Sequence, residues 1–122
     1  MKISKFFRSF FIGFIGLMHV IATEQNMRIH LVAAAGVIVA GFLLRLASWE
    51  WTAVLLCVGL VLSAECMNSA LERLADRVSL EKDPMIKHAK DCGSAAVLVL
   101  AIFSAVVGFI VIGPKIWSAL GW

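Results

Sequence analysis

Three long apolar segments constrain the fold of this chain more than any other feature of its sequence: residues 29–47, 51–70 and 93–113. Roughly 20 helical residues are needed to cross the ~30 Å hydrocarbon core of a bilayer. The chain has 122 residues, of which 61% are hydrophobic and 16% charged, and a soluble domain of this length cannot bury so much apolar surface. The sequence therefore predicts an all-α membrane protein with three transmembrane helices in one domain, residues 1–122.

Basic residues lie mainly on one side of the three predicted spans. Only Arg45 and Lys115 fall on the other side. The main group comprises Lys2, Lys5, Arg8 and Arg28 before the first span, and Arg73, Arg77, Lys82, Lys87 and Lys90 between the second and third. Because cytoplasmic loops are rich in lysine and arginine, we expect a cytoplasmic N-terminus. An aromatic belt at the far interface is expected from Trp49, Trp51, Trp117 and Trp122.

The N-terminal residues 1–27 combine basic residues with the apolar sequence FFIGFIGLMHVIA. A secretory signal has a similar beginning, but no small-x-small cleavage site is followed by a soluble domain. We expect an amphipathic helix that lies in the membrane interface, with its basic end at anionic headgroups and its phenylalanines at the acyl boundary. A fourth span over residues 6–22 is the alternative.

Four polar side chains at helical spacing, here called the polar stripe, lie at the end of the second span: Glu65, Asn68, Glu72 and Asp76. At about 100° per residue, they fall within roughly 80° of one another on one helix face. A carboxylate near the centre of a bilayer costs roughly 2.5 kcal/mol or more. The polar stripe is therefore a candidate functional site, and Glu65 is its strongest member because it closes an otherwise apolar run.

Residues 72–92 are expected to form a cytoplasmic connection between the second and third spans. They contain the polar sequence SLEKDPMIKHAKD and the helix breaker Pro84. A solvated connection is also the simplest explanation for the charges from Glu72 to Asp91.

Two further polar clusters adjoin the predicted cytoplasmic interface: Glu24, Asn26, Arg28 and His30, and Lys90 with Asp91. His30 by itself is typical of a polar residue at the start of a span. Carboxylates on separate helix ends can share a divalent ion with nucleotide phosphates. A lysine can neutralise transferred phosphate, and a deeper carboxylate can take a proton from a lipid hydroxyl. Since P-loop, dinucleotide-binding and hydrolase-elbow motifs are missing, the clusters indicate phosphoryl transfer to a lipid alcohol.

The strings AECMNSALERLADRV and AKDCGSAAVLVL, with Gly16 eight residues before Glu24, resemble the signature of the prokaryotic diacylglycerol kinase family. The similarity runs from Lys5 to about Val111, and its central motif is Glu-x-x-Asn-Ser-Ala-x-Glu followed by Asp-Arg and Ala-Lys-Asp. The resemblance implies a lipid kinase of the bacterial cytoplasmic membrane. It also implies a homotrimer with N-terminal surface helices and active sites shared between neighbouring subunits.

The same resemblance implies roles for individual residues. Glu65 would be the general base that deprotonates the lipid alcohol, and Glu24 and Glu72 would bind the Mg²⁺ that accompanies ATP. Asn68 and Asp91 would complete the catalytic group. The residues around the nucleotide and its phosphates would be Lys5, Arg8, Glu24, Asn68, Glu72, Asp76, Lys90 and Asp91. For Lys5 and Arg8, a role in membrane topology alone is the alternative.

Two parts of the sequence imply different lipid acceptors. TEQNMRIHL around Glu24 resembles the branch of the family that phosphorylates undecaprenol, whereas KDCGSAAVL resembles the branch that phosphorylates diacylglycerol. Diacylglycerol is the expected acceptor, giving phosphatidate and ADP, because the third-span motif and the MNSALE string together cover more residues. Undecaprenol is the alternative acceptor.

Two other classes of function are compatible with an intramembrane acid. A small proton-coupled transporter would use Glu65 as its proton carrier but would leave Glu24, Glu72, Lys90 and Asp91 without a task. In a non-catalytic membrane adaptor, the polar stripe would be a seam between assembled helices.

Overall fold

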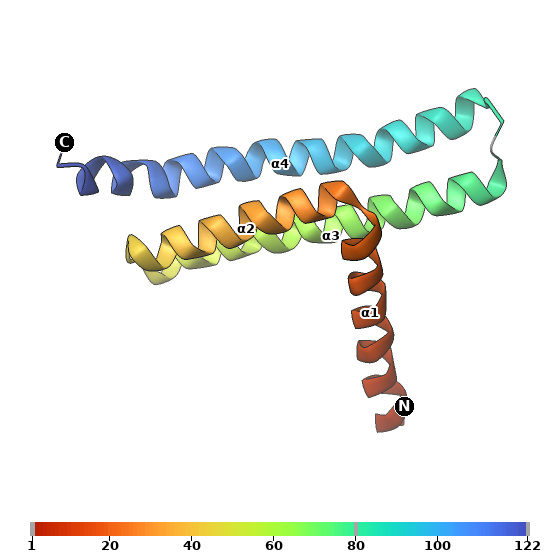
Figure 1. The fold of residues 1–122 in the computed structure, drawn as a ribbon, viewed down its shortest axis with the longest axis horizontal. Helices are drawn as coiled ribbons and strands as arrows, with labels where there is room; N and C mark the ends of the chain where they lie inside the picture. The colour runs from red at the N-terminus through yellow and green to blue at the C-terminus, as the bar shows by residue number, and fades with distance from the viewer. Residues whose placement is uncertain (1, 80, 122) are drawn as a thin grey trace.

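The computed structural model describes residues 2–79 and 81–121 and contains four α-helices (Figure 1). In chain order they are α1 (Ile3–Thr23), α2 (Gln25–Leu43), α3 (Ser48–Val78) and α4 (Pro84–Ala119). Helices α2, α3 and α4 lie side by side, while α1 projects sideways from the start of α2 (Figure 1). The main packing is between α3 and α4, and α2 packs chiefly on α3. The described residues include no strand, so the predicted all-α class is confirmed.

The three predicted spans correspond to the three helices of the bundle. Residues 29–47 cover most of α2 and the turn after it, residues 51–70 lie within α3, and residues 93–113 lie within α4. All four helices, α1 included, are long and apolar enough to cross a membrane. By length and composition, α1 therefore meets the requirement for the alternative fourth span, and its placement in the interface stays a prediction.

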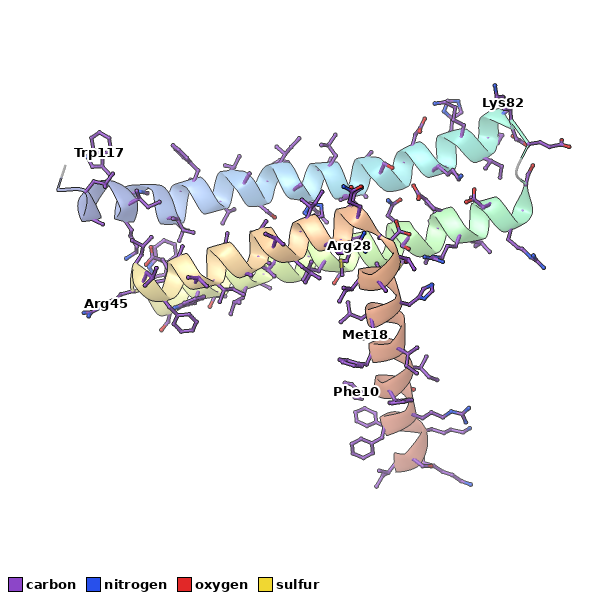
Figure 2. The ribbon with its side chains drawn as sticks, viewed as in Figure 1. Phe10, Met18, Arg28, Arg45, Lys82 and Trp117 are labelled. Atoms are coloured by element: carbon purple, nitrogen blue, oxygen red, sulfur yellow. The ribbon has the colours of Figure 1, made fainter. Side chains whose placement is uncertain are left out.

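Helix α1 has few protein neighbours within the chain. Val20, near its C-terminal end, is its one buried residue. Large apolar side chains along the rest of α1 are exposed, including Phe10 and Met18, which Figure 2 shows on the projecting helix. Such a helix needs lipid or another subunit to cover its apolar surface.

The polar connection predicted over residues 72–92 is mainly helical, because α3 continues to Val78 and α4 begins at Pro84. Proline is favoured in the first turn of a helix, where its missing N–H is not needed. The Asp83 side chain accepts a hydrogen bond from the Met85 N–H at 2.8 Å and caps α4. Pro84 therefore starts a helix here instead of breaking one.

The turn between α2 and α3 closes the other end of the bundle. The Leu46 N–H bonds to the Gly41 carbonyl at 3.1 Å and the Arg45 N–H to the Phe42 carbonyl at 3.4 Å. This is the Schellman arrangement, in which one residue adopts the left-handed conformation. Here that residue is Arg45, with φ of 54°. The turn directs the Leu46 side chain into a small apolar core with residues from α3 and α4.

The four tryptophans of the predicted aromatic belt do not have equivalent environments. Trp49 and Trp117 are exposed. Trp51 is half-buried, and its ring lies so close to Gly41 that a Cβ on this glycine would be 2.9 Å from Trp51 Cζ2. Trp51 therefore packs α3 against α2. Trp122 lies outside the described residues.

Candidate functional site

The part of α3 that carries the polar stripe lies beside the joint between α1 and α2 (Figure 1). Its first carboxylate, Glu65, is buried with 4% of its surface exposed, and the neighbouring Ser69 is buried to the same extent. Helix α2 contacts this region of α3 from one side and α4 contacts it from the other. At its Glu65 end, the polar stripe is therefore enclosed by helices of the same chain.

The joint between α1 and α2 is fixed to α3 by charged and polar side chains. Glu24 has an extended backbone and separates the two helices. Its Oε1 accepts hydrogen bonds from Ser69 Oγ at 3.3 Å and Arg73 Nη2 at 3.4 Å. Arg73 also donates to Thr23 Oγ1 at 2.8 Å. From the other side, Arg28 donates to two carbonyls in the last turn of α1, at 3.3 and 2.9 Å. These bonds set the position of the Glu24 carboxylate.

Glu65 is paired with a histidine of α2. The His30 Nε2 atom lies 3.2 Å from Glu65 Oε1, and the two side chains are 23% and 5% exposed. The distance suits an ion pair, yet the geometry makes no hydrogen bond, and Oε1 has no hydrogen-bond partner in the described part of the chain. A buried acceptor without a donor is costly. Glu65 is therefore suited to receive a proton or a donor from a bound molecule.

The other end of the polar stripe, at Asp76, is bonded to α4. Asp76 Oδ1 forms a close ion pair with Lys90 Nζ, which lies before the apolar span of α4. The hydrogen bond to Asp76 raises the pKa of Lys90 above its usual value, and the nearby Glu72 carboxylate adds to the effect. Lys90 thus places a permanent positive charge beside two carboxylates of the polar stripe.

Asn68 lies where Gly93 allows a close approach of α4 to α3. A Cβ on Gly93 would lie 2.8 Å from Leu71 Cδ2 and closer still to Asn68 Oδ1. Only glycine lets the two helices approach this closely without moving these side chains. Asn68 Oδ1 is also buried and lacks a hydrogen-bond partner among the described residues. The amide is therefore fixed by packing and keeps a free acceptor.

Glu72 lies between these two groups of contacts. On α3 it is three residues after Ser69, which bonds Glu24, and four residues before Asp76, which bonds Lys90. Residues three and four apart on a helix are neighbours on its surface. Glu72 therefore lies on the α3 surface between the residue that bonds Glu24 and the residue that pairs with Lys90.

The carboxylates near the joint do not form a complete site for a divalent ion by themselves. Within residues 2–79 and 81–121 no group of three His, Cys, Asp or Glu is arranged to bind a metal. An ion bound by one or two carboxylates in this region would therefore also need phosphate oxygens and water as ligands. Mg²⁺ is commonly held in this way, by one or two carboxylates plus substrate phosphates.

Three residues expected at the site are not brought to it within one chain. Lys5 and Arg8 lie near the start of the projecting helix α1. At 1.5 Å per residue, Lys5 is roughly 27 Å along the helix from its end at Thr23. Asp91 forms its ion pair with Lys87 on the same helix, at 2.7 Å, and this hydrogen bond lowers the pKa of Asp91.

An apolar cavity of about 360 Å³ adjoins the buried end of the polar stripe. It lies between α2, α3 and α4, and its walls are mainly alanine, valine and other small or aliphatic side chains. His30 is the one basic group in its wall and also contacts Glu65. A long apolar chain in this cavity would have its polar end at His30 and Glu65.

A second cavity of about 560 Å³ lies at the α3–α4 end of the molecule. Most of its lining residues are charged or polar, and they include Asp76, Lys82, Lys87 and Lys90. The two cavities thus differ in chemistry, and the polar stripe runs between them.

Sequence reasoning overlooked several residues of this arrangement. Ser69 and Arg73 follow Glu65 at intervals of four residues, so the helical spacing that defined the polar stripe could have found them. The sequence around His30 is typical of an ordinary interfacial residue and does not indicate its contact with Glu65. Gly93 carried no local signal, since its close contact with α3 exists only after folding.

Comparisons with known proteins agree with the resemblance seen in the motifs. A family model described as prokaryotic diacylglycerol kinase matches residues 12–112. The chain is 34% identical to undecaprenol kinase of Bacillus subtilis over 115 residues, 94% of each chain. It is 34% identical to diacylglycerol kinase of Synechocystis over 113 residues, 92% of this chain and 65% of the relative. It is also 43% identical to diacylglycerol kinase of Escherichia coli over 64 residues, 52% of this chain and 49% of the relative.

Proposed function

The chain belongs to the prokaryotic diacylglycerol kinase family, as an ATP-dependent lipid kinase of a membrane, and we propose that its acceptor is undecaprenol. The product would be undecaprenyl phosphate, with ADP as the second product. The observation that supports this reaction most directly is the buried Glu65 carboxylate, which lies between a cluster of polar side chains and an apolar cavity.

Glu65 is the proposed general base. Its carboxylate oxygen lacks a hydrogen-bond donor among the described residues, so it can accept the proton of a lipid hydroxyl. Asn68, one turn further along α3, would orient the reacting groups, and its amide is fixed by the packing of Gly93. Positioning and charge neutralisation are the main requirements of phosphoryl transfer, which explains how so short a chain can suffice.

Glu24 and Glu72 are the proposed ligands of Mg²⁺ that accompanies ATP. When bound, the ion would neutralise negative charge on the phosphates. Arg73 and Lys90 add fixed positive charge on either side of Glu72 and would contact the transferred phosphoryl group. The polar cavity at the α3–α4 end, with Asp76 in its wall, is the proposed position of the rest of the nucleotide.

Two observations favour undecaprenol over diacylglycerol as the acceptor. The similarity to the Bacillus subtilis undecaprenol kinase extends over nearly the whole of both chains. In addition, an apolar cavity leads away from His30 between the three helices of the bundle, and its mainly aliphatic lining suits an isoprenoid chain.

Diacylglycerol is the second candidate acceptor. The sequence KDCGSAAVL resembles the diacylglycerol-phosphorylating branch. Diacylglycerol kinase of Pseudomonas aeruginosa is 47% identical over 58 residues, 48% of this chain. By contrast, the transporter hypothesis gains no support, since the relatives found are named as kinases.

The projecting helix α1 supports a further part of the proposal, a homotrimer in the cytoplasmic membrane with composite active sites. Lys5 and Arg8 are too far along α1 to reach Glu24 of their own chain. In an assembly, α1 could lie in the cytoplasmic interface and present these charges to a neighbouring subunit. Asp91 would likewise act only after its pairing with Lys87 is exchanged for a contact with the nucleotide.

The proposal is tested with purified protein in detergent micelles, Mg²⁺ and γ-labelled ATP. Undecaprenol, diacylglycerol and ceramide are offered separately, and kcat/KM is compared. Higher kcat/KM for undecaprenol supports the proposal, higher kcat/KM for diacylglycerol supports the second candidate, and no labelled lipid from any of them rejects both.

A matched pair of variants tests the base. Glu65→Gln should reduce kcat by about 100-fold or more, the usual contribution of a general base. Glu50→Gln is the control, since Glu50 is another buried carboxylate on α3 but lies at the far end, against Lys115. Full turnover of Glu65→Gln would contradict the assignment.

A further inference from the structure

His30 occupies a position that the proposed reaction does not yet use. It lines the apolar cavity, and its Nε2 atom lies 3.2 Å from Glu65 Oε1. Its side chain is 23% exposed, compared with 5% for Glu65. His30 therefore stands between the buried carboxylate and the more accessible surface of the chain.

A general base must be reset after each turnover. As the lipid hydroxyl oxygen forms its bond to the γ-phosphorus, the bond from that phosphorus to the bridging oxygen breaks and ADP leaves with the electron pair. The hydroxyl proton is left on Glu65, where little water has access. Before another hydroxyl can be deprotonated, this proton has to leave.

We propose that His30 acts through Glu65, not on the substrate. Its Nε2 atom receives this proton from Glu65 and then releases it to water. Imidazole suits the task because it both accepts and donates protons near neutral pH. The inference rests on the proposed kinase reaction and adds to it a route for the released proton. The net result is one proton delivered to the cytoplasmic side for each lipid phosphorylated.

The surroundings of His30 leave Glu65 as its specific partner. Helix α3 contributes Glu65, which contacts His30, and Cys57 in the cavity wall. The residues that α4 contributes to the wall are not ionisable. On the same helix, Arg28 is bonded to carbonyls of α1, and Glu24 at the joint is bonded to α3.

The test is chemical rescue of His30→Ala in the labelled-ATP assay. We expect kcat to fall by about 10- to 100-fold with the KM for ATP little changed, because proton transfer is lost while nucleotide contacts remain. Added imidazole should restore turnover in a saturable manner. Pyrazole, which has nearly the same shape but is a far weaker base, should not.

Two controls make the result decisive. His19→Ala removes an exposed histidine of α1, and neither azole should change its rate. His30→Gln keeps a polar side chain of similar reach and should show the same loss of kcat, which serves as the test if His30→Ala does not fold. Equal rescue by imidazole and pyrazole, or wild-type kcat in His30→Gln, would overturn the proposal. Turnover of the wild-type protein in the same assay tests the kinase reaction itself. A failure of the proposed kinase reaction can therefore be distinguished from a failure of the proposed role of His30.

Discussion

Replacing Gly93 with alanine should impair catalysis while leaving the fold intact. The new Cβ would be 2.8 Å from Leu71 Cδ2 and closer still to Asn68 Oδ1. Since nonbonded heavy atoms prefer separations of about 3.5–4.0 Å, the Asn68 amide would have to move by roughly 1 Å. The substitution therefore displaces a proposed catalytic group without removing it.

The expected size of the effect follows from this displacement. Misplacing a positioned group by about 1 Å can reduce turnover by about 100-fold, so we expect kcat to fall about 10- to 100-fold. Stability should change little. Alanine is favoured over glycine in a helix by about 1 kcal/mol, which offsets part of the cost of moving the side chains. Both colliding atoms are at the ends of side chains that can rotate.

The assay compares initial rates of lipid phosphorylation with thermal unfolding of the same preparations. Gly59→Ala is the matched control, because a Cβ at that helical glycine meets nothing within 4 Å. In an Asn68→Ala background, Gly93→Ala should cause no further loss, since the displaced group is already absent. Wild-type turnover of Gly93→Ala, or losses that multiply in the double variant, would refute the reasoning.

Three other substitutions probe separate parts of the structure. Arg73→Met should lower kcat/KM for ATP at least tenfold, measured by initial rates, because it removes the cation that contacts Glu24 at 3.4 Å. Arg45→Gly should raise the unfolding free energy by about 1 kcal/mol, measured by denaturant titration, since glycine adopts positive φ without strain; an unchanged midpoint would contradict this. Glu50→Ala should lower the thermal midpoint, because Lys115 loses its partner at 3.1 Å, while turnover below that midpoint stays unchanged.

The class of the fold and the composition of the polar stripe are local properties, and the sequence predicted them. Apolar length alone identifies α2, α3 and α4 as candidate spans. Helical periodicity alone places Glu65, Glu72 and Asp76 on one face of α3. Neither inference depends on how the helices pack, because helix geometry fixes the angle between residues on the same helix.

The start of α4 was harder to predict from the sequence. The charged residues after Glu72 are compatible with a loop, but Pro84 at the first position of a helix and the Asp83 cap start α4 well before its apolar span. The same physical rule about proline supports either a break or a start, and the choice depends on the residues around it.

The sequence by itself determined that this protein is a bundle of membrane helices with an acidic face, because hydrophobic length and helical phase are set by neighbouring residues in the chain. Only the tertiary structure decided which side chains meet across helices. His30 lies against Glu65, and Gly93 leaves room for the Asn68 side chain. Lys90 forms an ion pair across helices with Asp76, whereas the adjacent Asp91 forms its ion pair within α4. These contacts depend on the rotation and approach of helices that are distant in sequence, which packing between their surfaces decides.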